Sequence, residues 1–174
     1  MATEYPSITP EQAELINTAP LFFVAGVDPS LEQRPNGLGP LNLSPKGGTP
    51  LHILDENHVA YLDYQGSGNE TARSAALGGP MTIMICSFGE GNAAVVRLFG
   101  HGSATPLAES PLAERLLGRP FDDIALPARQ VIELTVESTQ TSCGYGVPVM
   151  EYRHERTTAM RGRQYKPGGS RARV

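Results

Sequence analysis

The residues best suited to chemistry in this sequence lie in one stretch, 59–71, whose pattern suits the binding of an anion such as a phosphate. It begins as a strand and turns helical after Gly66 and Gly68. Ser67 is placed to cap the new helix, and Glu70 to complete a capping box. Glycines let the backbone approach a ligand, and a helix start offers free N–H groups with partial positive charge. An ordinary strand–turn–helix with a good cap is the alternative interpretation.

A second group of polar side chains alternates along a predicted strand, 41–47. Because successive side chains of a strand point to opposite faces, Asn42, Ser44 and Lys46 share one face. They either form a solvent-exposed face or line a site, where the amide and hydroxyl would give neutral hydrogen bonds and Lys46 a charge that pairs with phosphate. Pro45 disfavours a fully paired interior position for this strand.

The elements that must position these residues are short and separated by glycine and proline turns. Capping residues and apolar spacing predict short helices over about 10–18, 71–77 and 111–117. Together with the strands, they predict a mainly β fold, an antiparallel β-barrel with helices packed outside. The predicted strands are 21–27, 41–47, 51–54, 59–65, 81–88, 94–104 and 129–138.

Two of the later strands carry further signals. Arg97 sits between apolar positions, so it is either an exposed edge residue or a buried charge that needs an anionic partner. Gly100 and Gly102 fall on the opposite face and indicate a sharp bend or close backbone packing. Alternation in the last strand breaks after Ser138, which predicts its end there. The polar segment that follows, 139–152, is unusual for a plain loop.

Composition limits the class of protein. With 174 residues, of which 40% are apolar and 18% charged, the chain is expected to be globular. No apolar run reaches the ~18 residues needed to span a membrane. The N-terminus lacks the pattern of a secretory signal, and Cys86 and Cys143 are expected to be free thiols, so a cytoplasmic protein is predicted. No spacing of cysteines and histidines indicates a metal site.

Charge divides the sequence into two parts. Residues 153–174 hold seven Lys or Arg and one Glu, a net charge of +6, which leaves −10 for residues 1–152 out of the overall −4. We therefore predict a single domain over 1–152 and a basic, Gly/Arg-rich tail over 153–174. The tail is either a solvated end or a contact for an anionic partner. The acidic body offers no broad footprint for a nucleic-acid backbone, so a nucleic-acid partner is not expected.

Five segments together resemble the pyridoxamine 5′-phosphate oxidase-like family, the FMN-binding split barrels. The resemblance covers roughly residues 10–152 and implies an antiparallel split β-barrel that forms a homodimer with its cofactor sites at the interface. The segments are 22–25, 42–47, 62–71, 97–100 and 140–148. The cofactor-binding residues that it implies are Asn42, Leu43, Ser44, Lys46, Leu62, Asp63, Ser67, Gly68, Asn69 and Thr71, with Arg97, Thr141 and Ser142 placed near the flavin ring by the partner subunit.

Two functions of different classes fit this resemblance. The first is a flavin-dependent oxidoreductase acting on an unknown small molecule, in which FMN does the redox chemistry and no catalytic side chain is assigned. The second is a non-catalytic binder or carrier of flavin, deazaflavin or haem. The true oxidase of the family has a basic Arg/Lys pair where this chain has Gly68 and Asn69, and a tryptophan in a C-terminal segment that has no counterpart here. A substrate other than pyridoxamine phosphate is therefore expected.

Overall fold

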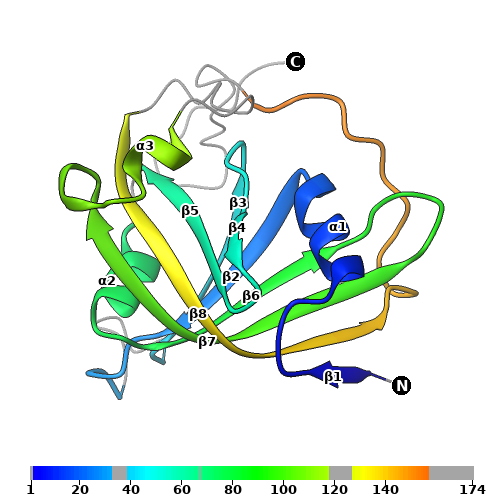
Figure 1. The fold of residues 1–174 in the computed structure, drawn as a ribbon, viewed down its shortest axis with the longest axis horizontal. Helices are drawn as coiled ribbons and strands as arrows, with labels where there is room; N and C mark the ends of the chain where they lie inside the picture. Colours follow the sequence, from blue (N-terminus) through cyan, green and yellow to red (C-terminus); the bar gives the residue numbers. More distant parts are fainter. Residues whose placement is uncertain (1, 33–38, 67, 118–126, 157–174) are drawn as a thin grey trace, which may run out of the picture.

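The computed structural model describes residues 2–32, 39–66, 68–117 and 127–156 of the chain. In this part of the chain, eight strands form one antiparallel sheet in the order β3-β2-β6-β7-β8-β5-β4, with β1 paired to β8 (Figure 1). The strands are β1 (Thr3–Tyr5), β2 (Leu21–Val27), β3 (Leu41–Gly47), β4 (His52–Asp55), β5 (His58–Tyr64), β6 (Pro80–Cys86), β7 (Ala94–Pro106) and β8 (Ala128–Cys143). The helices are α1 (Pro10–Thr18), α2 (Glu70–Ala76), η1 (Leu107–Glu109) and α3 (Ala113–Leu116).

The sheet curls around an apolar interior without closing, so that β3 and β4 are the two ends of its pairing order. Val24, Ile83, Leu98 and Ile132, from four different strands, are each no more than 1% exposed and belong to one core cluster. Burial of each such side chain contributes about 1.5–3 kcal/mol. The prediction of a mainly β, antiparallel split barrel is confirmed. The position of β3 at one end also agrees with the expectation drawn from Pro45.

Helix α1 begins where the sequence predicts. The Thr9 hydroxyl accepts from the Gln12 N–H at 3.3 Å, and the Gln12 side chain accepts from the Thr9 N–H at 3.1 Å, which completes a capping box. Pro10 occupies the first turn, where its missing N–H has no consequence. Ile16 turns inward and anchors the helix on the core.

The start of α2 differs from the prediction. The N-cap residue is Asn69 rather than Ser67, it makes no side-chain capping bond, and the Glu70 carboxylate accepts from the Asn69 N–H at 3.0 Å. Ser67 lies outside the described residues. Since α2 has only seven residues, its dipole is small, and the helix start alone is a weak reason to expect an anion. Its end is as predicted, because Gly78 has a positive φ of 66° and follows the C-cap residue Leu77.

Strand β8 runs further than alternation suggests, to Cys143. The predicted end at Ser138 is wrong because tertiary pairing continues the strand, with β7 on one side and β1 on the other. Thr139 is fully buried there, and its hydroxyl donates to the Ser7 carbonyl at 3.2 Å. Strand β1 was not predicted, since three polar residues carry no local signal.

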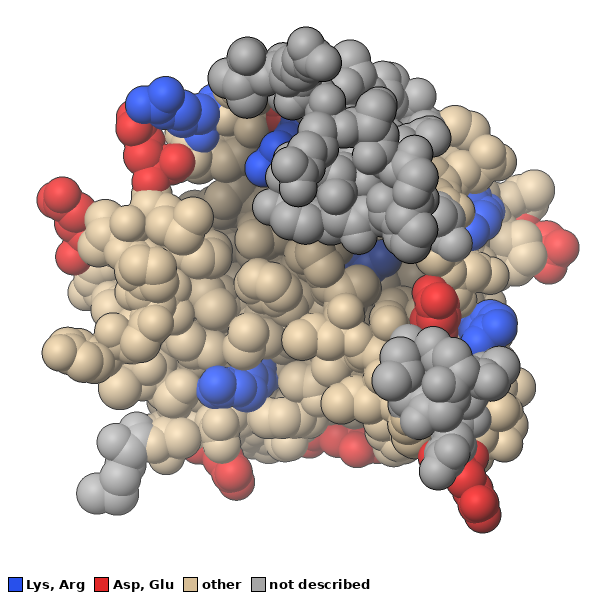
Figure 2. All heavy atoms as spheres, turned by 180° about the vertical axis from the view of Figure 1, so that it is seen from behind, with Lys and Arg blue, Asp and Glu red and all other residues tan. Residues whose placement is uncertain are grey.

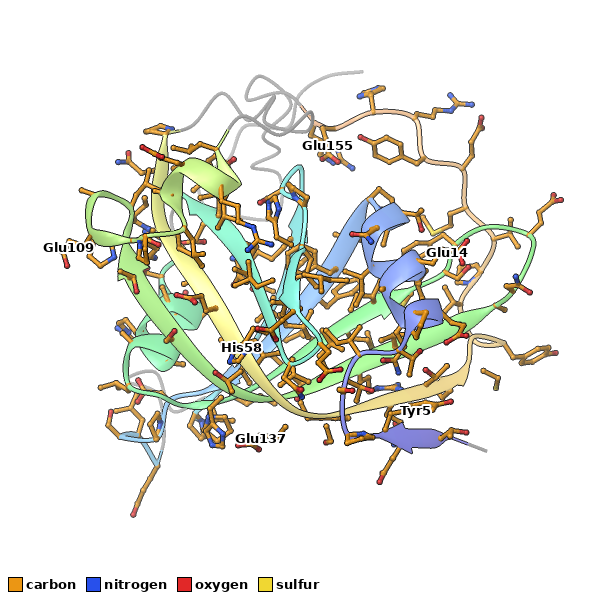
Figure 3. All side chains as sticks on the ribbon, in the orientation of Figure 1. Tyr5, Glu14, His58, Glu109, Glu137 and Glu155 are labelled. Atoms are coloured by element: carbon orange, nitrogen blue, oxygen red, sulfur yellow. The ribbon has the colours of Figure 1, made fainter. Side chains whose placement is uncertain are left out.

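A second, smaller core lies on the outer side of β5 and β8. Leu116 of α3 is fully buried there against Leu62 and Val131. Strand β5 is consequently buried on both faces. Side chains fill the space inside the sheet in Figure 3, whereas the labelled Glu109 lies at the periphery. Seen from behind, the described surface is mostly uncharged, with charged side chains standing singly or in small groups (Figure 2). None of the helices in the described residues is long and apolar enough to cross a membrane.

Candidate functional site

The alternate polar residues of β3 face inward. Asn42, Ser44 and Lys46 are half-buried, whereas Leu41 and Leu43 on the other face are exposed, the reverse of an ordinary edge strand. Asn42 donates from Nδ2 to the Thr71 hydroxyl of α2 at 3.1 Å, and the Ser44 hydroxyl lies 3.3 Å from the same oxygen. The three side chains therefore contact α2 and β5 and do not form a fully solvent-exposed face, while their role as a binding site stays a prediction.

Asp63 of β5 is the centre of the remaining contacts. Its carboxylate accepts from Lys46 Nζ at 3.3 Å, from Gln130 Nε2 at 2.8 Å and from the guanidinium of Arg129. Burial raises the pKa of Asp63, but the hydrogen bonds from Arg129 and Gln130 and the charge of Lys46 outweigh it, so the pKa lies below its ordinary value. Asp63 therefore stays ionised near neutral pH and is unsuited to act as a general acid there.

Arg129 and Gln130 extend the cluster toward the start of α2. Gln130 donates to the Asn69 side chain at 3.2 Å, and Arg129 to the Gly68 carbonyl at 3.4 Å. We call this group the polar cluster; its members are Asn42, Ser44, Lys46, Asp63, Asn69, Thr71, Arg129 and Gln130. It joins the edge strand β3 to β5, α2 and the start of β8.

Two polar atoms at the cluster are buried without a hydrogen-bond partner among the described residues, Arg129 Nε and the Tyr61 hydroxyl. Tyr61 packs edge-on against Phe22, and its ring centroid lies 5.7 Å from Lys46 Nζ. Burial, and then the charge of Asp63, raise the pKa of Tyr61, so its hydroxyl stays protonated. A buried guanidinium N–H without an acceptor is costly, which points to an acceptor outside the described residues.

The chemistry of these groups suits a phosphate. Lys46 and Arg129 against Asp63 leave one positive charge in excess, and Asn42 and Ser44 add neutral donors. Such donors, with one N–H of Arg129 unused, match the oxygens of a phosphate monoester. The Asp63 carboxylate would compete for the same cations, so a phosphate would bind beside it rather than in its place.

Sequence reasoning missed Arg129 and Gln130. The residues opposite Asp63 and Tyr64 across the β5–β8 pair are Gln130 and Ala128, and a bulge separates the two pairs. The only local signal for these two residues was the polar start of β8. By itself, such a start is equally typical of a strand end in contact with solvent. Only the register of two strands far apart in the sequence brings these residues to Asp63.

Other predicted site residues lie away from the polar cluster. The Leu43 side chain is 64% exposed on the outer face of the sheet, and Leu62 is buried in the second core. Arg97 donates to the Ser142 hydroxyl at 3.0 Å, and Thr141 accepts from Gln12 Nε2 of α1 at 2.9 Å. The expected contact of Arg97, Thr141 and Ser142 with the flavin ring of a partner subunit stays a prediction.

Comparison with known proteins gives a consistent family. No protein-family model matches the sequence. The chain is 32% identical over 149 residues to the pyridoxamine 5′-phosphate oxidase family protein ustO of Aspergillus flavus, an alignment that covers 84% of this chain and 56% of that protein. The chain thus spans little more than half the length of the curated relative that it matches.

Solved structures share the fold at low sequence identity. A variant of HupZ from Group A Streptococcus superposes with a TM-score of 0.58 at 21% identity, over 78% of this chain and 99% of that one. A candidate pyridoxamine 5′-phosphate oxidase from Lactobacillus delbrueckii gives 0.54 at 19% identity, over 78% and 94%. The resemblance seen in the sequence motifs is confirmed, and this chain is a split-barrel relative of the pyridoxamine 5′-phosphate oxidase family.

Proposed function

We propose that this protein binds FMN, with the phosphate held by the polar cluster, and that it is a flavin-dependent oxidoreductase acting on a small molecule. The observation that carries the proposal is the buried Arg129 Nε, which lacks an acceptor among the described residues and lies beside Lys46 in a cluster rich in donors. The family name of the curated relative supports a flavin as the molecule that carries the phosphate. Once bound, the flavin would supply the redox chemistry that no side chain provides.

The residues of the cluster have distinct roles in this proposal. Arg129 and Lys46 would hold the phosphate charge, and Asn42 and Ser44 would donate to its oxygens or to the ribityl hydroxyls. Asp63 would hold both cations in place before the ligand arrives, because it accepts from each of them. A pre-positioned cation loses less side-chain entropy on binding than one that has to be ordered by the ligand.

We further propose that two chains associate through the outer face of β3, β2, β6 and β7. Cross-strand pairing aligns Leu43, Ala25, Thr82 and Phe99 in one row on that face, opposite the core. Leu41 and Leu43 of β3 are 59% and 64% exposed on that face, and neighbouring exposed apolar side chains favour association with another surface. The expected contribution of Arg97 and Ser142 to the partner's flavin belongs to this arrangement.

The proposed function is tested by comparing FMN with riboflavin, which has the same ring and no phosphate. FMN should bind at one per chain and more tightly than riboflavin. Lys46→Met and Arg129→Met should each weaken FMN binding roughly tenfold and leave riboflavin binding unchanged, since each removes a charged contact to the phosphate. Quenching of flavin fluorescence on titration measures both affinities.

Arg153→Met is the matched control, because the Arg153 side chain is 81% exposed and far along the chain from the polar cluster. Thermal unfolding of each variant checks that it folds. Equal affinity for FMN and riboflavin would contradict the phosphate site. A protein that takes up neither flavin would contradict the whole proposal, and a haem Soret band in the purified protein would replace FMN with haem.

A further inference from the structure

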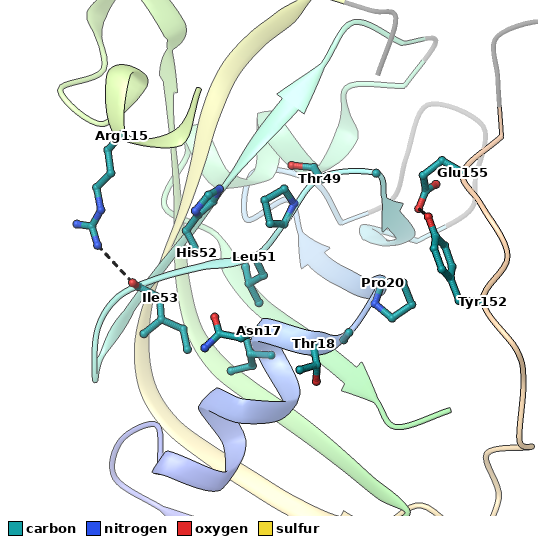
Figure 4. A pocket seen from close by; sticks show the side chains of 14 residues that line it. Asn17, Thr18, Pro20, Thr49, Leu51, His52, Ile53, Arg115, Tyr152 and Glu155 are labelled. Carbon is teal, nitrogen blue, oxygen red and sulfur yellow. Dashed lines mark hydrogen bonds between the residues drawn. The ribbon is translucent and has the colours of Figure 1, made fainter. Parts of the chain in front are cut away.

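A second concave site lies apart from the polar cluster, and shares no residue with it. It is a pocket of about 350 Å³ between the end of α1, the connection from β3 to β4, and the extended segment that carries Tyr152 and Glu155 (Figure 4). Arg115 of α3 reaches it from the other side. Its volume is within the range of sites for small molecules.

The inner wall of the pocket is apolar. Ile16 and Leu51 are 3% and 4% exposed and belong to the main core, and Ile53 packs against that core. Pro20 and Pro50 also line the pocket and hold the chain in fixed conformations, since their φ angles are restricted. This wall would favour a ligand with an apolar body, because covering it removes apolar surface from water.

Side chains of opposite charge lie at the two ends of the pocket. Figure 4 shows Arg115 on one side of the pocket and Glu155 on the other. Among the described residues, Arg115 donates only to the Ile53 carbonyl, at a long 3.4 Å, and it takes part in no salt bridge with them. Glu155 accepts from the Tyr152 hydroxyl at 3.1 Å and likewise forms no salt bridge with the described residues. Within the described residues, each of these two charges thus has no oppositely charged partner.

We propose that this pocket binds a small zwitterion with an apolar body, its carboxylate at Arg115 and its ammonium at Glu155. The charges at the two ends are complementary to such a molecule, and the apolar wall between them matches its body. Tyr152 also lines the pocket, and its hydroxyl donates to the Glu155 carboxylate. The site is independent of the proposed flavin site, and it would bind its ligand with or without FMN.

Three probes of similar size separate the parts of this proposal: 3-phenylpropanoate, 3-phenylpropylamine and the zwitterion 3-[4-(aminomethyl)phenyl]propanoate. Titration of the full-length protein followed by backbone amide NMR should shift the signals of Asn17, Leu51 and Ile53. The zwitterion should bind most tightly, with roughly three- to fivefold lost for each charge removed, as expected for partly exposed ion pairs.

Charge-removing variants assign the two ends. Arg115→Met should weaken the zwitterion and the propanoate by the same three- to fivefold and leave the amine unchanged. Glu155→Gln should weaken the zwitterion and the amine and leave the propanoate unchanged. Arg153→Met, a neighbour of Glu155 that does not line the pocket, should change none of them.

Asn17→Trp tests the position of the site, because Asn17 is an exposed residue of α1 that lines the pocket, and a large side chain there would fill it without disturbing the core. All three probes should then lose binding, while the thermal unfolding temperature stays unchanged. Equal affinity for the three probes would overturn the zwitterion. Binding that survives in Asn17→Trp, or shifts confined to other residues, would overturn the pocket itself.

Discussion

Asp63 determines how the cations of the polar cluster are arranged. It is the carboxylate that Lys46 and Arg129 both approach, and its side chain is only 10% exposed. Removing one member of a buried charged group leaves the others without a partner. The free-energy cost of this loss is larger than the stabilisation that the intact pair provides. The cluster should therefore contribute to stability as well as to binding.

Unfolding experiments at low pH should reveal how much ionised Asp63 contributes to stability. The folded-state pKa of Asp63 lies below its unfolded value, so its stabilisation is complete above the unfolded-state pKa of about 3.9 and is lost as the pH falls through the folded-state pKa. We expect Asp63→Asn to lower the free energy of unfolding by roughly 2 kcal/mol near pH 7. The difference from wild type should shrink toward pH ~2. Urea unfolding across this range measures it.

Glu109→Gln is the control, since that exposed carboxylate should contribute equally little at every pH. A difference between Asp63→Asn and wild type that stays constant with pH would contradict the role assigned to ionised Asp63.

At the scale of elements, a bulge in β8 opposite Phe99 and Gly100 of β7 shapes the barrel. The register of the β7–β8 pair shifts between Phe99 and Gly100, and a Cβ at Gly100 would lie 1.8 Å from the Thr135 carbonyl oxygen. Gly100 thus reflects close backbone packing, one of the two expectations, whereas Gly102 makes room for the Met81 side chain and for Ala75 of α2. A bulge increases local twist and bends the strand, which helps the sheet curl around its core.

Gly100→Ala should therefore destabilise the fold by about 3 kcal/mol, because either the bulge or the long β7–β8 pair has to shift. The free energy of unfolding in urea measures the loss. Gly89→Ala is the matched control: no atom lies within 4 Å of a Cβ at that position, and the change should stay within about 0.5 kcal/mol of wild type. Similar losses for the two variants would show that the contact at Gly100 is relieved without cost.

At the scale of the whole molecule, the outer face that carries Leu43 is the surface best suited to a second copy. Leu43→Lys should shift the protein from dimer to monomer at micromolar concentration, because it places a charge within the proposed apolar contact. Size-exclusion chromatography with light scattering measures the mass directly.

Leu117→Lys is the matched control, since Leu117 is also exposed, at 45%, but follows α3 on another part of the molecule. It should leave the mass unchanged. A monomeric wild-type protein, or a Leu43→Lys variant that stays dimeric, would contradict the proposed interface.

The sequence by itself determined most of the local structure. The capping box at Thr9 and the glycine after α2 are signals between neighbours in the chain, and each placed a helix end close to its observed position. The alternation in 129–138 likewise gave the start of β8, though not its end. The same reasoning placed Asn42, Ser44 and Lys46 on one face. It also carried the family resemblance, because motifs are local patterns too.

Only the tertiary structure decided which other residues the predicted site residues contact. The register of β5 against β8 brings Arg129 and Gln130 to Asp63, and pairing with β1 and β7 carries β8 beyond Ser138. Asn69, the N-cap of α2, also contacts a residue far away in the sequence, since its side chain accepts from Gln130 of β8. Contacts between residues far apart in sequence depend on the packing of the whole sheet, and no local pattern encodes them.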